Sequence, residues 1–276
     1  MAGFAIEDSL LKVVTQSLPV GQVLILFGAM GAALFAAVAG RTKVRLFSRD
    51  VISRPMRIRV CFEVTGRLFY MLAIALTPLS AATVILQATP LVVVGGAAIV
   101  FGEKVGWRRW TAIVIGLIGV LVILQPGRES FSTLSLLAVL GMLGFAGRDL
   151  ASRAAPISLG ASVLGFYGFL AVIVAGGGFA LWQGAAFVIP GGMAALCLVA
   201  ATVIGVISYG SLMRAMRIGA VSAVTPFRYT RLLFGVGLGI ALFGEVLSPA
   251  MIAGCGLIVL SGLFILWRGK RAGAPN

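Results

Sequence analysis

The chain has 276 residues, of which 60% are hydrophobic and only 11% are charged. Soluble domains carry roughly 25% charged residues, so this chain cannot cover itself with a polar, water-facing surface. Lys and Arg outnumber Asp and Glu by 22 to 8, which gives a net charge of +14. No basic stripe with interleaved aromatic residues accompanies this charge, so nucleic-acid binding is not supported. The composition excludes a soluble globular domain and indicates a membrane protein.

The sequence predicts ten membrane spans, because nearly every stretch of about 20 residues between charged clusters is apolar. Tight turns containing Pro or Gly connect them, and no segment is long enough to form a soluble domain. The expected fold is therefore an all-α integral membrane protein. In chain order, the predicted spans are 1–17, 20–40, 58–78, 82–102, 109–125, 133–151, 161–183, 190–213, 219–243 and 248–267.

Basic residues are concentrated in alternate loops, which predicts the orientation of the chain. The other loops contain only Arg128, whereas basic residues also follow the fourth, sixth, eighth and tenth spans. Lys and Arg favour the cytoplasmic side, so both termini are expected in the cytoplasm, with the chain in a bacterial inner membrane. The loop after the second span is the most basic, with Arg41, Lys43, Arg45, Arg49, Arg54, Arg57 and Arg59.

The two halves of the sequence, 1–127 and 128–276, resemble each other. A shift of 142 residues places the Phe-Gly-Glu triplet of 101–103 on the same triplet at 243–245, and a shift of 141 places Asp8 on Asp149. Each half holds five predicted spans, an odd number, so the copies would cross the membrane in opposite directions. This predicts an inverted-topology repeat, the plan of many secondary transporters. The first span lacks about eight residues that begin the sixth, so either that helix is short or its start was assigned late.

Charged residues inside the spans are unevenly distributed, although each costs about 2.5–3.5 kcal/mol at the bilayer centre. Spans one, three, six and nine carry them, whereas the interiors of spans two, five, seven and ten contain none. Spans four and eight add Gln87 and Tyr209. These six polar spans are related by the repeat. The sequence therefore predicts a central cavity lined by spans one, three, four, six, eight and nine, with the apolar spans against lipid.

The polar residues of these spans are the candidate substrate site. Glu63 and Arg67 are four residues apart and can pair on one helix face, either as a structural ion pair or with Arg67 facing the cavity. Two further arginines share a face of span nine and need an anionic partner or substrate, although the first could instead reach the cytoplasmic surface. The candidate substrate-binding residues are Asp8, Glu63, Arg67, Gln87, Asp149, Tyr209, Arg228, Tyr229 and Arg231.

Pro90 and Pro226 fall inside spans four and nine, where each should kink its helix beside the cavity and could serve a gate. No metal-binding, phosphate-binding or other enzyme motif is present, and the three cysteines have no spaced partners, so no cofactor or metal is expected. Histidine is absent, so any proton coupling would have to use a carboxylate.

The Phe-Gly-Glu triplets, each followed by a helix rich in Gly and branched residues, resemble the EamA-type repeats of the drug/metabolite transporter superfamily. The stretch 226–231 resembles one common in its bacterial members, and the start, with Asp8 and Lys12, is similar to the family's first helix. The resemblance covers nearly the whole chain and implies ten helices, a central cavity and alternating access. That family includes exporters of amino acids and importers of riboflavin or S-adenosylmethionine, so substrate and direction stay open.

The sequence thus predicts a secondary carrier, embedded in membrane lipid, for a small organic metabolite. The cavity charges nearly balance, which favours a zwitterion or a weak anion over a multivalent cation. One alternative is a membrane-embedded enzyme acting on a lipid or lipid-linked substrate, and a weaker one is a partner subunit without flux of its own. The oligomeric state is left open. The charges counted are Glu7, Asp8, Lys12, Glu63, Arg67, Arg148, Asp149, Arg228 and Arg231.

Overall fold

A computed structural model describes residues 1–102, 106–125, 133–218, 228 and 230–272 of the chain. Every regular element in these stretches is a helix, so the predicted all-α fold is confirmed. The first half contains α1 (Ala2–Thr15), α2 (Val20–Arg41), a 3-10 turn η1 (Arg49–Ile52), α3 (Arg54–Leu76), α4 (Leu79–Leu86), α5 (Thr89–Phe101) and α6 (Trp107–Leu124). The second contains α7 (Ser135–Ala154), α8 (Ala161–Gln183), α9 (Gly192–Ile218), α11 (Thr230–Phe243) and α12 (Pro249–Ala272).

These helices are apolar enough for a multi-pass membrane protein. Five of them, counting α4 and α5 as one span, are long and apolar enough to cross a bilayer. Shorter apolar helices lie in α6, α11 and α12. The second and third helices of the chain show the contrast, because α2 is apolar apart from Gln22 and its last residue, Arg41, whereas α3 carries several arginines and a glutamate.

The fourth predicted span is not one kinked helix but two consecutive helices. It begins at Leu79, three residues earlier than predicted, and α4 ends at Leu86. Pro90 lies in the first turn of α5, where its missing N–H removes no helical hydrogen bond. Thr89 Oγ1 donates to the Leu86 carbonyl oxygen across the break, at 2.5 Å. The other predicted gating residue, Pro226, lies outside the described residues.

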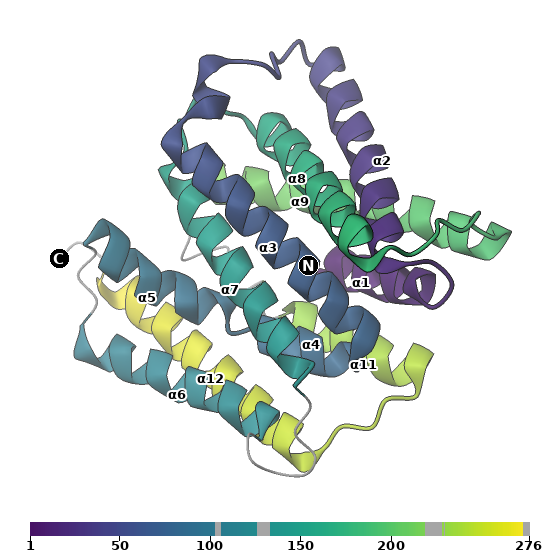
Figure 1. The fold of residues 1–276 in the computed structure, drawn as a ribbon. Coiled ribbons are helices and arrows are strands. Elements are labelled where there is room, and N and C mark those ends of the chain that lie inside the picture. Colours follow the sequence, from purple (N-terminus) through teal and green to yellow (C-terminus); the bar gives the residue numbers. More distant parts are fainter. Residues whose placement is uncertain (103–105, 126–132, 219–227, 229, 273–276) are drawn as a thin grey trace.

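The helices that were predicted to be apolar form two pairs at opposite sides of the molecule. Figure 1 shows α2 beside α8 on one side and α6 beside α12 on the other, with α3 and α7 between them. Large apolar side chains remain exposed on these pairs, including Leu181 of α8 and Leu260 of α12. Such surfaces are unfavourable in water but are ordinary against lipid.

Close contact between α3 and α7 fixes the centre of the fold. Gly66 and Gly144 face each other there, and a Cβ atom on Gly144 would lie 2.4 Å from the Gly66 Cα atom. Small residues of this kind let membrane helices approach backbone to backbone. On the same two helices, one to five residues from this crossing, lie Glu63, Arg67, Arg148 and Asp149. The crossing therefore sets how near the charged side chains of α3 come to those of α7.

Candidate functional site

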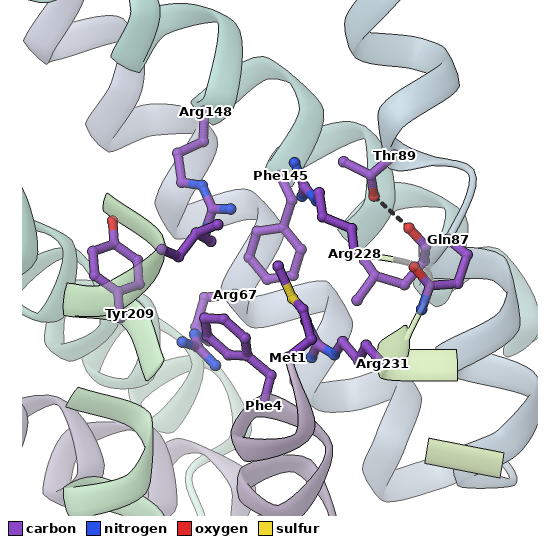
Figure 2. A pocket seen from close by; sticks show the side chains of 12 residues that line it. Met1, Phe4, Arg67, Gln87, Thr89, Phe145, Arg148, Tyr209, Arg228 and Arg231 are labelled. Carbon is purple, nitrogen blue, oxygen red and sulfur yellow. Dashed lines mark hydrogen bonds between the residues drawn. The ribbon is translucent and has the colours of Figure 1, made fainter. Parts of the chain in front are cut away.

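A small cavity of about 40 Å³ lies among the polar helices at the centre of the molecule (Figure 2). Its walls come from α1, α3, the α4–α5 break, α7, α9 and the segment that leads into α11. These are the six spans that the distribution of polar residues predicts. The lining residues are Met1, Phe4, Arg67, Leu86, Gln87, Thr89, Phe145, Arg148, Tyr209, Leu212, Arg228 and Arg231.

The charged part of the cavity wall is cationic. Four arginines line it, and the described lining contains neither Asp nor Glu. The carboxylates of Glu7, Asp8, Glu63 and Asp149 are each at most 5% exposed and lie behind the arginines, to which they are bonded. An entering solute therefore meets guanidinium groups first. The predicted carboxylate site residues act one step back from the cavity, by holding the arginines in place.

Arg67 pairs with α1 and not with its own helix. Its Nη1 donates to Glu7 Oε1 at 2.9 Å, whereas Glu63, four residues earlier on α3, bonds other partners. The predicted Glu63–Arg67 pair is therefore wrong in its partner, although both residues belong to the cavity network. Gly205 of α9 makes room for Glu7, because a Cβ atom there would lie 3.0 Å from Glu7 Oε2.

Arg231 of α11 also pairs with α1. Its Nη2 donates to Asp8 Oδ2 at 2.5 Å, and the Tyr70 hydroxyl donates to the same oxygen at 3.1 Å. Two atoms near these pairs, Arg67 Nε and Arg231 Nε, are buried without a hydrogen-bond partner in the described structure. Both arginines thus keep hydrogen-bonding capacity beyond what their carboxylates use.

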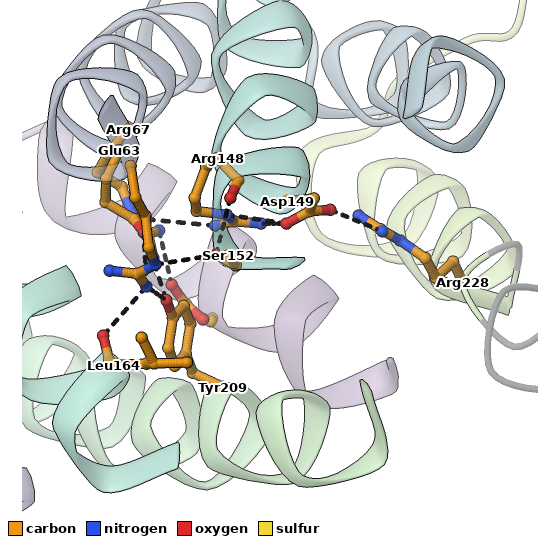
Figure 3. Close-up of polar contacts among 10 residues, drawn as sticks. Glu63, Arg67, Arg148, Asp149, Ser152, Leu164, Tyr209 and Arg228 are labelled. Carbon is orange, nitrogen blue, oxygen red and sulfur yellow. Dashed lines mark hydrogen bonds and ion pairs between the residues drawn. The ribbon is translucent and has the colours of Figure 1, made fainter. Parts of the chain in front are cut away.

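The remaining charges form a chain across α3, α7 and the start of α11 (Figure 3). Glu63 accepts from Arg59 at 3.3 Å and from Arg148 at 3.2 Å. Arg148 also donates to Asp149 Oδ1 through Nε and Nη2, at 3.0 and 2.9 Å. Asp149 Oδ2 then accepts from Arg228 Nη1 at 2.8 Å. Arg228 is therefore tied to a carboxylate of α7 and does not extend to the membrane surface.

Arg59 is the cavity-network residue that the sequence analysis missed. It was assigned to the basic loop after the second span, but α3 begins at Arg54, so Arg59 lies in its second turn and is fully buried. Its Nε donates to Ser152 Oγ at 2.9 Å, and its Nη2 donates to the Leu164 carbonyl oxygen and to the Tyr209 hydroxyl. The signal available in the sequence was its four-residue spacing from Glu63.

Aromatic rings hold the planes of the cavity arginines. Arg148 lies over the Phe145 ring, 4.6 Å from its centroid, and Arg231 lies over the Phe4 ring at 5.1 Å. Arg67 lies 5.3 Å from the centroid of Phe27. Guanidinium groups stack well on aromatic faces, which stabilises their charge and limits their movement. The arginines are therefore preorganised, which lowers the entropy lost when a ligand binds them.

Tyr209 and Gln87, the predicted uncharged donors that the structure describes, line the cavity and also bond other residues of the protein. The Tyr209 hydroxyl donates to Glu63 Oε2 at 3.3 Å while it accepts from Arg59. With its amide nitrogen toward α11, Gln87 donates to the Arg228 carbonyl at 3.3 Å and accepts from the Leu232 N–H at 2.9 Å. Gln87 thus joins the α4–α5 break to the start of α11. Tyr229, also a predicted site residue, lies outside the described residues.

A second polar cluster, the Glu245 cluster, lies where α11 has ended and α4 begins. Glu245, from the second Phe-Gly-Glu triplet, accepts from the Leu79 N–H at 2.6 Å and from the Ser80 N–H at 2.8 Å. The Ser80 hydroxyl donates to it at 2.5 Å, and Lys12 Nζ lies 3.8 Å from its Oε1. Lys12 also donates to the Thr77 carbonyl at 2.6 Å. Lys12, predicted as a cavity charge, instead belongs to this cluster.

The described residues contain no group of three or more His, Cys, Asp or Glu side chains that could hold a metal ion. What the cavity offers is a set of oriented cations, aromatic faces and a few hydroxyl and amide groups. That combination suits the reversible binding of a small organic solute with an anionic or polar group.

Comparison with known proteins agrees with this picture. The EamA-like transporter family matches residues 1–125. The riboflavin transporter of Vibrio cholerae is 29% identical over 220 residues, which cover 78% of this chain and 72% of that protein. The pseudopaline exporter of Pseudomonas aeruginosa is 27% identical over 275 residues, or 97% of this chain and 93% of that one. The S-adenosylmethionine uptake transporter of Rickettsia felis is 26% identical over 72% of this chain and 67% of its own length.

A solved crystal structure shares the fold. It superimposes with a TM-score of 0.66 over 95% of this chain and 96% of that chain, at 19% sequence identity. The similarity extends through both halves of the chain, whereas the family match is confined to residues 1–125.

Proposed function

Since residues 1–125 belong to the EamA-like transporter family, we propose that this chain is a secondary transporter for a small organic metabolite, zwitterionic or weakly anionic. It would act by alternating access in the bacterial inner membrane, with both termini in the cytoplasm. The basic loops support this orientation, because Lys and Arg residues favour the cytoplasmic side. An uptake transporter and an exporter are similar to this chain at 26% and 27% identity, so the direction of transport is not part of the proposal.

The observation that carries the proposal is the cationic cavity between helices of both halves of the chain. Arg67 comes from the first half, whereas Arg148, Arg228 and Arg231 come from the second. Transporters built from repeats hold their substrate at the interface between the repeats, near the middle of the membrane. A cavity assembled in this way changes its access when one half moves against the other. An enzyme would need a reactive group beside the cavity, and the arginine wall supplies none.

The helix contacts support an inverted repeat of two five-span halves, 1–127 and 128–276. In chain order, α1, α2 and α3 of the first half correspond to α7, α8 and α9 of the second. If the halves are exchanged, the α3–α7 contact therefore becomes an α9–α1 contact, and the structure has both. The same exchange converts the α3–α8 contact into the α9–α2 contact, which is also present. The contacts of α2 with α8 and of α6 with α12 map onto themselves. Such a set of contacts is expected for two copies related by a pseudo-two-fold axis.

The Glu245 cluster supports alternating access, because it joins three cavity helices at one end. Lys12 is four residues beyond Asp8 on α1, so the cluster lies about 6 Å further along that helix than the cavity. It holds the start of α4 against the segment after α11, and we propose that it closes the extracytoplasmic end of the cavity. Opening would require Glu245 to leave the Leu79 and Ser80 N–H groups. Pro90, at the α4–α5 break, lets α4 move separately from α5.

Flux through the purified protein tests the proposal. The full chain is reconstituted in liposomes, and uptake of riboflavin, S-adenosylmethionine, amino acids and organic acids is compared with uptake by empty liposomes. We expect saturable flux of at least one solute and its loss in Arg231→Ala, with folding retained. Arg57→Ala is the matched control, because Arg57 is exposed and far along α3 from the cavity. Absence of flux for every solute class, in either direction, would contradict the transporter.

Closure at the Glu245 cluster has its own test. A cysteine replaces Leu212, which lines the cavity, after Cys61, Cys197 and Cys255 are changed to serine. Glu245→Gln should raise the rate at which an impermeant thiol reagent, added from the extracytoplasmic side, labels this cysteine. Ser248→Ala, which alters the exposed N-terminus of α12, should leave that rate unchanged. Equal labelling in the Glu245→Gln and unmodified backgrounds would show that the cluster does not control access.

A further inference from the structure

The cavity network separates into balanced pairs and one unbalanced chain. Arg67 with Glu7 and Arg231 with Asp8 each cancel their charge. The other charged residues form the continuous chain of Figure 3, which contains three arginines but only two carboxylates, namely Arg59, Glu63, Arg148, Asp149 and Arg228. Among the described residues, this chain therefore carries one positive charge that no carboxylate compensates.

The excess charge lies at Arg228. Arg148 uses Nε, Nη1 and Nη2 on the two carboxylates of the chain. Arg59 is fully buried and bonded to Glu63, Ser152 and the Leu164 carbonyl, so a solute cannot reach it. Arg228 has Asp149 as its one described carboxylate partner, through Nη1, and it lines the cavity with 16% of its side chain exposed. Residues 219–227 and 229, beside it in sequence, include no Asp, Glu, Lys or Arg.

An uncompensated cation in apolar surroundings is unfavourable and attracts an anion of matching shape. A carboxylate matches a guanidinium group, because its two oxygens accept two parallel N–H bonds. We propose that Arg228, with Arg148 beside it, forms a subsite for one carboxylate of the transported solute. This deepens the proposed function and rests on it, because it narrows the substrate to organic anions with a single net negative charge.

The same wall disfavours the other charge classes. A cationic substrate group would meet four arginines and, in the described lining, no carboxylate. The ammonium group of a zwitterion would have to bind hydroxyl, amide or backbone oxygens alone, at a distance from the carboxylates behind the wall. A second carboxylate on the solute would exceed the one uncompensated charge. A monocarboxylate that carries no cationic group therefore fits this cavity best.

The subsite can be tested without knowing the substrate, because acetate is a carboxylate of the size that a cavity of about 40 Å³ accepts. The full chain in detergent is heated in sodium chloride, in sodium acetate at equal ionic strength, and with acetamide added as the neutral analogue. We expect acetate to raise the unfolding midpoint by about 2–4 °C at saturation and acetamide to leave it unchanged. Arg228→Gln should abolish the acetate response, whereas Arg57→Gln, an exposed arginine of α3, should retain it.

Equal responses to acetate and acetamide, or a full acetate response in Arg228→Gln, would overturn the subsite. Arg228→Lys keeps the charge without the planar pair of donors, so it should retain a reduced response, and it replaces the Gln variant if that variant does not fold. The outcome is separate from the transporter itself. Flux of a neutral or cationic solute with no acetate response overturns the subsite alone. An acetate response without flux of any solute overturns the transporter and leaves the anion site.

Discussion

The central cavity and the Glu245 cluster both place charged groups in apolar surroundings, but they compensate those charges differently. In the Glu245 cluster, one carboxylate receives two backbone N–H groups, one hydroxyl and one nearby ammonium. Among the described residues of the cavity network, arginines outnumber carboxylates, and Arg67 Nε, Arg231 Nε and Glu7 Oε2 are buried without a described partner. The cluster is complete as it stands, whereas the cavity keeps bonding capacity and charge that a solute can use.

That difference has a physical reason. A carboxylate at a helix N-terminus is satisfied by N–H groups that have no other partner, so the contact is strong and needs nothing further. Arginines held by single carboxylates are different, because each guanidinium has five N–H donors and uses only a few of them. Substitutions in the cavity should therefore affect both folding and flux, whereas substitutions in the Glu245 cluster should affect how the helices are held together.

The largest effect is expected for Glu63→Ala. Its carboxylate is 1% exposed and bonds both Arg59 and Arg148, so its removal leaves buried cations without compensation. Loss of one partner from such a pair costs about 3–5 kcal/mol. Chemical unfolding in detergent measures the loss. Asp50→Ala is the control, because Asp50 bonds Ser158 in an exposed contact and should change stability by about 0.5 kcal/mol or less. Similar losses in both variants would show that the cavity network does not hold the fold.

The next effect is expected for Gly144→Ala. The new methyl group would lie 2.4 Å from the Gly66 Cα atom, and backbone cannot move aside as a flexible side chain can. Overpacking of this kind costs about 1–3 kcal/mol. It should also reduce flux, because separating α3 from α7 lengthens the contact between Glu63 and Arg148. Gly177→Ala on α8 is the matched control, because no neighbouring atom of the described residues lies within 4 Å of the added Cβ, and it should be neutral or slightly stabilising in the same unfolding assay.

A smaller effect is expected for Glu245→Gln. The amide can still accept hydrogen bonds from α4, but the charge that interacts with Lys12 and with the helix N-terminus is lost, at a cost of about 1 kcal/mol. A double-mutant cycle with Lys12→Met measures the coupling of the two charges. Less-than-additive loss of the unfolding midpoint indicates direct coupling. Strict additivity would mean that Lys12 is held by the Ile74 and Thr77 carbonyls alone.

The smallest effect is expected for Tyr209→Phe. The hydroxyl accepts from Arg59 and donates to Glu63, but both of these residues keep other partners, so the cost is at the low end for a hydrogen bond, about 0.5 kcal/mol. Tyr167→Phe on α8 is the control, because Tyr167 does not line the cavity. Flux and thermal unfolding are measured for both. A fall in flux with little change in the midpoint would assign the Tyr209 hydroxyl to the solute; equal behaviour of the two variants would assign it to packing.

Much of this arrangement follows from the sequence. The uneven distribution of buried charge identified the six helices that line the cavity, because charge inside a membrane is tolerated only where protein or water surrounds it. The spacing of Arg228 and Arg231 indicated an anionic partner or an anionic substrate, and in the structure Arg228 bonds Asp149 and Arg231 bonds Asp8. The ion-pair partners, by contrast, were not predicted correctly. The four-residue spacing of Glu63 and Arg67 predicts an ion pair within α3. In the structure, each residue instead bonds a side chain of another helix.

Some helix boundaries were also predicted wrongly from the sequence, and one of these errors concealed a residue of the cavity network. The third span was predicted to begin at residue 58, yet Arg59 was still counted with the basic loop before it, whereas α3 begins at Arg54 and buries Arg59. Hydropathy cannot place a helix end inside a basic stretch, because the same arginines that lower the hydropathy can snorkel or pair. The prediction of one continuous fourth helix was wrong for a related reason, since a proline such as Pro90 is as common at the start of a helix as at a kink.

The sequence by itself determined that this protein lies in a membrane, that its basic residues are concentrated in alternate loops, and that six of its helices are polar. These properties depend on side-chain solvation and on spacing along one chain, both of which are local. Only the tertiary structure decided that the arginines face the cavity while the carboxylates lie behind them, and that Glu245 lies on the start of α4. Those outcomes depend on the approach of helices far apart in sequence, such as α3 and α7 at Gly66 and Gly144, and no local property specifies that approach.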